Sequence, residues 1–115
     1  MLHVYGIKNC NTVKKAINWL EEHQLPYTFH DYKKEGISEN KLEEWEKEIS
    51  WEKLLNKKGT TWKKFDVEEQ ATVTDAHTAN QVLIKNTSMI KRPVIEGGKQ
   101  ILLGFDELEY ASSLK

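Results

Sequence analysis

The side-chain pattern of the first third of the chain changes from strand-like to helical and back to strand-like, and this constrains the fold more than any other feature. Residues 2–5 form a short strand-like run, and residues 27–32 alternate aromatic and polar side chains as a strand does. Between them, residues 11–23 place apolar side chains at the i, i+3, i+4, i+7 spacing of one buried helical face: Val13, Ala16, Ile17 and Leu20. Because a helix crosses between the two strands, we expect them to be parallel with a right-handed connection.

The middle of the chain is predicted to be mostly helical. Ser38 can cap the start of a helix, and a short helical piece is expected at residues 51–55. Residues 56–64 are rich in lysine and threonine and contain a glycine, which favours a basic turn or loop. Helical signals resume at about residues 75–85.

Strand signals return near the end of the chain. Residues 93–96 and 99–103 flank Gly97 and Gly98, a pattern typical of a tight antiparallel hairpin. A closing helix should follow Gly104, end near residue 113 and bury one face made of Phe105, Leu108 and Ala111. The order of elements predicts an α/β fold with a small mixed sheet, in a single domain covering residues 1–115.

The charge balance excludes several classes of partner. Seventeen Lys and Arg face eighteen Asp and Glu, giving a net charge of -1, so nothing global attracts nucleic acid or a membrane surface. No apolar segment approaches the length needed to span a bilayer, and no signal peptide is evident, so we expect a cytoplasmic protein. The four histidines have no metal-ligand spacing, and no metal site is expected.

Cys10 is the only cysteine, and it lies where the first predicted strand gives way to the first helix. The N–H groups at a helix start favour negative charge, so a sulfur placed there should ionise more readily than a free thiol. Asn11 or Thr12 can cap this helix, and Lys8, Lys14 and Lys15 lie nearby. The alternative is a small buried hydrophobe without reactivity. A single cysteine also excludes an internal disulfide, so a redox cycle needs a second sulfur from another molecule.

Three motifs resemble the arsenate reductase, Spx and YffB family. They are Tyr-Gly-Ile-Lys-Asn-Cys-Asn-Thr-Val-Lys-Lys-Ala at residues 5–16, Met-Ile-Lys-Arg-Pro-Val at 89–94, and Gly-Phe at 104–105. The Tyr-Gly-Ile and Gly-Thr-Thr-Trp elements are most similar to the YffB branch. The resemblance covers nearly the whole chain. It implies a thioredoxin-like fold with a helical insertion at about residues 36–90, and a cis proline, Pro93, facing the cysteine.

The resemblance also implies that Arg92 lies close to Cys10. Its planar cation would then stabilise the thiolate and bind a carboxylate or oxyanion. The alternative is a surface arginine paired with a nearby acid. Pro93 at the start of a strand is compatible with the sequence because it costs no ladder hydrogen bond there.

The chain departs from the arsenate-reducing branch at several positions. Gly6 stands where those reductases carry a histidine, and Val13 stands where they carry a serine. The expected middle-loop arginine falls near Asn56, and no arginine lies around residues 104–105. Arsenate reduction is therefore not expected.

The basic loop is a second candidate binding element. Its cations, hydroxyls and glycine could hold a glutathione carboxylate, with Lys57, Lys58 and Trp62 as the candidate residues. A solvated lysine-rich loop is the alternative.

Three functional hypotheses follow. The first is a monothiol oxidoreductase in which Cys10 attacks a disulfide or oxidised substrate, Arg92 and Pro93 complete the site, Asn11 and Thr12 line it, and glutathione is the co-substrate. The second is a Spx-like transcriptional regulator that binds RNA polymerase. The redox-switching members of that branch have a second cysteine at the position of Val13, so no internal switch can form here. The third is a binding module with an inert Cys10, in which the insertion's tryptophans are core or partner surface.

Overall fold

A computed structural model describes residues 1–115. The chain divides into two compact units, one made of residues 1–35 and 92–115 and the other of residues 36–91. The assignment of residues 1–115 to a single domain stays a prediction. None of the helices has the length and apolar character needed to cross a bilayer.

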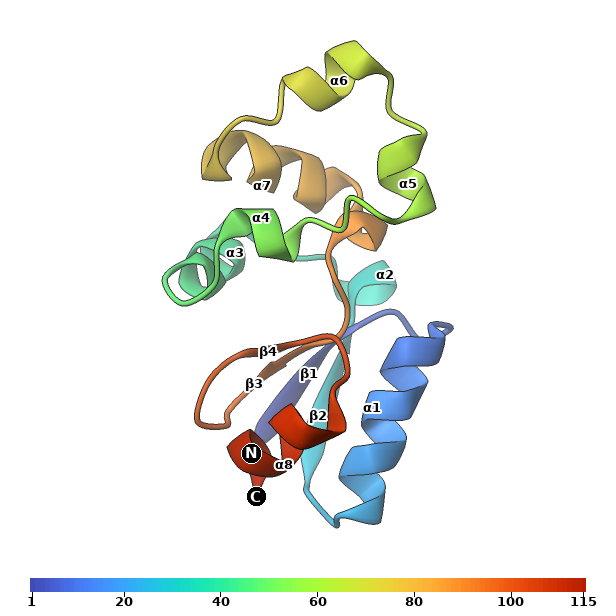
Figure 1. The fold of residues 1–115 in the computed structure, drawn as a ribbon, viewed down its shortest axis with the longest axis vertical. Helices are drawn as coiled ribbons and strands as arrows, with labels where there is room; N and C mark the ends of the chain where they lie inside the picture. Colours follow the sequence, from blue (N-terminus) through green and yellow to red (C-terminus); the bar gives the residue numbers. More distant parts are fainter. The chain divides into compact units, whose positions relative to one another are not determined.

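The first unit contains a four-stranded mixed sheet with the order β2-β1-β3-β4. Its strands are β1 (Leu2–Gly6), β2 (Tyr27–Asp31), β3 (Val94–Glu96) and β4 (Leu102–Leu103). β1 and β2 are parallel, with Leu2 opposite Tyr27, and α1 (Asn11–Glu22) connects them (Figure 1). β3 runs antiparallel to both β1 and β4. The predicted parallel pair, the antiparallel pairing of β3 with β4 and the thioredoxin-like mixed α/β class are confirmed. The hairpin is not tight, because residues 97–101 connect the strands and the predicted strand at 99–103 is reduced to Leu102–Leu103.

The core of this unit lies between the sheet and the helices α1 and α8 (Glu107–Leu114). Val13, Ala16 and Leu20 of α1 are fully buried, as their spacing predicts. Ile17 is only half-buried, whereas Trp19 is 6% exposed and packs edge-on against Tyr110 of α8. The buried face is therefore turned toward Trp19 rather than Ile17.

The closing helix corrects another expectation. Leu108 is 85% exposed and Ala111 is exposed, whereas Tyr110 and Ser113 are buried. The reason is the cap: the Asp106 side chain accepts a hydrogen bond from Glu109 N, so the helix begins after Phe105. Phe105 therefore lies before the helix, and counting the helical spacing from it selected the wrong face of α8 as the buried one.

The second unit is helical. It contains α3 (Glu39–Glu46), α4 (Trp51–Leu54), α5 (Thr60–Lys63), α6 (Val67–Ala71), α7 (Ala76–Lys85) and the 3-10 turn Thr87–Met89. Ser38 caps α3 by accepting from Lys41 N at 3.1 Å, as predicted. The loop prediction at residues 56–64 was incomplete, because α5 forms within it. A short helix, α2 (Tyr32–Glu35), also follows β2 in the first unit; it was not predicted, and it includes Tyr32, the last residue of the predicted strand.

Each tryptophan of the predicted insertion can now be placed within the helical unit. Trp45 is fully buried and Trp62 is 8% exposed, whereas Trp51 is half-buried. Main-chain hydrogen bonds from Asn56 N to Met89 O and from Lys91 N to Leu54 O close this unit. The buried tryptophans therefore serve the core of their own unit.

We expect Leu20→Ala to destabilise the protein by about 2–5 kcal/mol because it leaves a cavity beneath α1. Leu108→Ala removes the same atoms from an exposed site and should change stability by no more than about 0.5 kcal/mol. Urea unfolding followed by circular dichroism measures both. A loss of similar size in the two variants would contradict the observed phase of α8.

Candidate active site

The sheet topology brings three separate chain segments to one edge. Because β1 and β2 are parallel, their carboxyl ends, Gly6 and Asp31, lie opposite each other. β3 is antiparallel to β1, and its first residue, Val94, pairs with Tyr5, so its amino end lies at the same edge. Cys10 therefore shares this edge with Arg92 and the proline that precedes β3.

Cys10 occupies the N-cap position of α1. Its backbone is extended (φ -117°, ψ 124°), and its carbonyl accepts a hydrogen bond from Lys14 N at 2.9 Å. The expectation that Asn11 or Thr12 caps the helix was wrong, because both already belong to its first turn. The sulfur is half-buried and lies one position nearer to the helix N-terminus than expected.

The surroundings of Cys10 favour the thiolate. Burial of the sulfur raises its pKa and is the largest single influence. The backbone N–H of Val13, the Arg92 guanidinium and the backbone N–H of Thr12 act together in the opposite direction and hold the pKa of Cys10 below its ordinary value. The sulfur does not accept a capping hydrogen bond of full geometry, so these donors stabilise the thiolate mainly through their proximity and charge. The charge comes from Arg92, whereas Lys8, Lys14 and Lys15 are exposed.

The second half of the site is the Arg92–Pro93 step. Arg92 is half-buried, Pro93 is buried, and the peptide bond between them is cis, as the resemblance implies. The carbonyl of Pro93 accepts a hydrogen bond from Gly104 N at 2.9 Å. Gly104 has φ 73°, a conformation that favours glycine, and its carbonyl accepts from the Tyr110 hydroxyl. These contacts explain why the Gly-Phe motif accompanies the proline motif.

Two tyrosines at this edge, and Glu96 at the other end of β3, were not identified from the sequence. Tyr5 donates to Glu96 Oε1 at 3.3 Å. Tyr32, the first residue after β2, is 2% exposed, and its hydroxyl has no hydrogen-bond partner. Burial and the neighbouring Tyr5 raise the pKa of Tyr32 strongly, Arg92 lowers it and Glu96 raises it further, so this phenol is neutral at physiological pH. The available signal was positional, because Tyr5 and Tyr32 lie at the carboxyl ends of the two parallel strands.

The two departures from the arsenate-reducing pattern lie against each other. A Cβ added to Gly6 would be 2.9 Å from Cγ2 of Val13, which is fully buried. Val13 is β-branched and has little rotamer freedom in a helix, so it cannot easily move away. A larger residue at position 6 and valine at position 13 are thus sterically incompatible in this arrangement.

The remaining predicted site residues belong to the helical unit. Lys57 and Lys58 are exposed, and Lys58 N donates to Asn56 Oδ1 at 3.2 Å. Trp62 is buried and lies 6.0 Å, centroid to centroid, from the Phe65 ring. Its burial favours the interpretation of Trp62 as a core residue, and a binding role for the three residues stays a prediction. No group of three or more His, Cys, Asp or Glu could hold a metal ion.

A mixed sheet with one cysteine at the start of its first helix, opposite a cis proline, defines a thioredoxin-like protein with a single-thiol site. The chain belongs to the ArsC family, whose model matches residues 5–113. It is similar to the solved structure of the YffB protein, with 43% identity, a TM-score of 0.94 and coverage of 100% of both chains. It is also similar to an arsenate reductase (ArsC) related protein from Brucella melitensis, with 43% identity and a TM-score of 0.76 over 99% of this chain and 94% of the other.

A more distant relative is the global transcriptional regulator Spx of Listeria innocua. It is 25% identical over 111 residues, which is 95% of this chain and 83% of the regulator. The resemblance seen in the three sequence motifs is thereby confirmed.

We expect Gly6→Ala to destabilise the protein by about 1–3 kcal/mol through overpacking against Val13. The Val13→Ala substitution should reduce that penalty because it removes the clashing methyl groups. A double-mutant cycle on unfolding free energies measures the coupling between the two positions. Additive effects of the two substitutions would show that Gly6 is required for another reason.

We expect the alkylation rate of Cys10 to rise with pH through a pKa below that of a free thiol. In Arg92→Ala the pKa should rise, so alkylation at neutral pH should be several times slower. Lys91→Ala is the matched control, because it removes an exposed cation next to Arg92 and should leave the profile unchanged. An unchanged profile in Arg92→Ala would assign the reactivity of the thiol to the helix start alone.

Proposed function

We propose that the protein is a monothiol oxidoreductase that reduces disulfides at the expense of glutathione. Membership of the ArsC family and arsenate reductase-related neighbours support a thiol oxidoreductase-like role. The observation that carries the proposal is the lowered pKa of Cys10, produced by the α1 N–H groups and Arg92. Thiolate is the form that attacks disulfides.

The proposed cycle has two exchange steps. The Cys10 thiolate attacks the glutathionyl sulfur of a mixed disulfide, forms a new S–S bond to it and releases the other half of the substrate as a thiolate, which takes up a proton. A second glutathione thiolate then attacks the same glutathionyl sulfur, releases Cys10 as thiolate and leaves oxidised glutathione. The net reaction exchanges one disulfide for another: the substrate–glutathione S–S bond is broken, the S–S bond of oxidised glutathione is formed, and the one glutathione thiol consumed replaces the substrate thiol released.

Glutathione is proposed because the chain has no second cysteine that could resolve the intermediate. Arg92 and the N–H groups of Thr12 and Val13 can pair with a glutathione carboxylate while they stabilise the leaving thiolate. In this proposal Lys57 and Lys58 provide secondary anion contacts. Arsenate is not proposed as the substrate, since Gly6 and Val13 replace the two polar helpers of the arsenate-reducing branch.

A Spx-like role is the second candidate, favoured by the 25% identity to the regulator over most of this chain. In that role the fold would bind RNA polymerase without a thiol switch, because Val13 occupies the position of the second cysteine. A regulator of this kind would not depend on the reactivity of Cys10.

We expect the protein to catalyse transfer of glutathione from a small mixed disulfide, measured as oxidised glutathione formed in a coupled assay. Cys10→Ser should abolish turnover, Arg92→Ala should lower kcat/KM about tenfold or more, and Lys91→Ala should match the wild type. Mass spectrometry should find one glutathionyl group on Cys10. Absence of both adduct and turnover, together with capture of RNA polymerase subunits by Cys10→Ser, would favour the regulator instead.

A further inference from the structure

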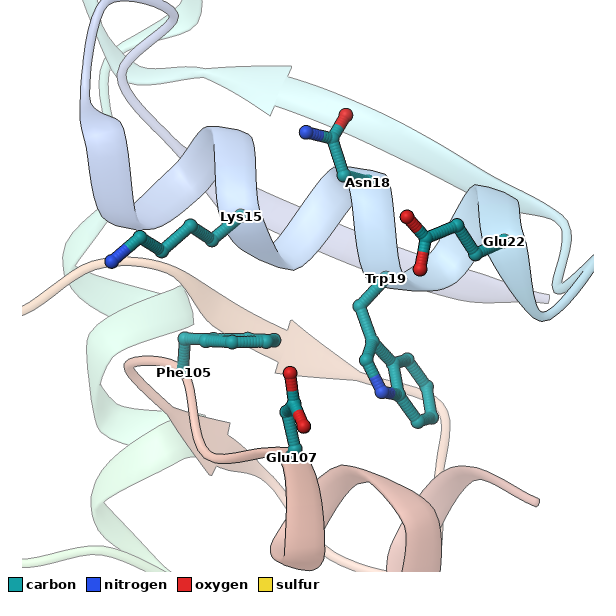
Figure 2. A pocket seen from close by; sticks show the side chains of 6 residues that line it. All are labelled: Lys15, Asn18, Trp19, Glu22, Phe105 and Glu107. Atoms are coloured by element: carbon teal, nitrogen blue, oxygen red, sulfur yellow. The ribbon is translucent and has the colours of Figure 1, made fainter.

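A groove of about 360 Å³ lies between α1 and the start of α8, outside the residues that hold the thiolate. One wall comes from α1 and the other from the segment that follows β4 (Figure 2). Six residues line it: Lys15, Asn18, Trp19, Glu22, Phe105 and Glu107.

Both walls of the groove belong to segments that also reach the thiol site. Lys15, Asn18 and Glu22 continue the helical stripe that begins at Asn11, the residue next to Cys10, at positions i+4, i+7 and i+11. Phe105 follows Gly104, whose N–H donates to the Pro93 carbonyl. At 1.5 Å rise per residue, Lys15 lies roughly 7 Å and Glu22 roughly 18 Å from Cys10 along the helix axis.

The groove presents negative charge next to aromatic surface. Figure 2 shows the Glu107 carboxylate directed from the start of α8 toward the space between the two walls, beside the Phe105 ring, whereas the Glu22 carboxylate lies along α1 above the Trp19 indole. Neither carboxylate has an ion-pair partner in the structure. Carboxylates beside ring faces are favourable surroundings for a guanidinium or ammonium group.

Trp19 adds an independent feature. The residue is 6% exposed, its indole is stacked on the His23 ring with centroids 3.9 Å apart, and its nitrogen faces the Glu107 side of the groove (Figure 2). The indole is held in place by α1 and Tyr110, and its N–H can donate a hydrogen bond to a carbonyl oxygen of a ligand. A cation alone would not use this N–H.

We propose that the groove binds an extended polypeptide segment carrying a Lys or Arg side chain, so that the substrates of Cys10 are glutathionylated proteins with a basic residue near the modified cysteine. This inference rests on the proposed function. One residue of a polypeptide supplies both groups that the groove requires, a backbone carbonyl for Trp19 and a cationic side chain for Glu22 and Glu107. At about 3.3 Å per extended residue, the basic side chain belongs about five positions from the reacting cysteine. Lys15, nearer to Cys10, disfavours a basic residue directly beside the cysteine.

Glutathionylated peptides that differ only in the residue five positions from the cysteine test the specificity. The wild type should turn over the Arg peptide with a kcat/KM about tenfold higher than the Glu peptide, and Glu107→Lys should remove or invert this preference. Glu109→Lys is the matched control, since it makes the same charge change in the first turn of α8 at a residue that does not line the groove. Equal turnover of the two peptides by the wild type would overturn the inference and leave the proposed function standing.

A binding measurement separates the two proposals. The same peptides with serine in place of cysteine cannot react, and their binding is followed through the indole N–H resonance of Trp19. The Arg peptide should shift this resonance in the wild type and in Glu109→Lys, but not in Glu107→Lys. Failure of the Arg peptide to shift it, or an equal shift with the Glu peptide, would overturn the inference whether or not Cys10 turns over disulfides.

Discussion

The parallel pairing of β1 with β2 is the constraint on which the rest of the site depends. A parallel pair requires a crossover, and α1 supplies it by burying Val13, Ala16 and Leu20 against the sheet. The crossover places the start of α1, and hence Cys10, at the carboxyl end of β1. The antiparallel β3 then brings Arg92 and Pro93 to the same edge. A thiol with a favoured thiolate form is thus a product of strand direction as much as of local charge.

Much of the fold and part of the site could be predicted from the sequence, for identifiable physical reasons. The α1 periodicity and the Gly97–Gly98 pair are local signals; the first gave the correct helix, and the second gave the correct antiparallel pairing but too long a second strand. The phase of α8 could not be obtained in this way, because Leu108 fits a helical period equally well whether or not it faces the core. Only the Asp106 cap determines where that period begins.

The site shows the same division between local and distant information. Cys10 could be identified because it is the only cysteine and lies at a predicted helix start, where a thiolate is favoured. Arg92 was found through a family resemblance, since nothing local joins it to the cysteine. Tyr32 and Glu96 were missed because their importance arises only when β1, β2 and β3 meet. The steric coupling of Gly6 and Val13 was also missed. The family resemblance shows that both positions depart from the arsenate-reducing branch, but not that a side chain at position 6 would occupy the space of Val13.

The position of the junctions between the two units has an evolutionary consequence. The chain leaves the sheet unit after α2 and returns at Arg92, so both connections start from the strand ends that carry the site. The four strands are complete without any residue from the intervening stretch. A helical segment of another length or sequence could be exchanged there without changing strand register, since lengthening a closed loop costs little free energy. Proteins with this sheet can therefore differ in the helical segment, and in what that segment binds, while keeping the strand ends that position Cys10 and Arg92.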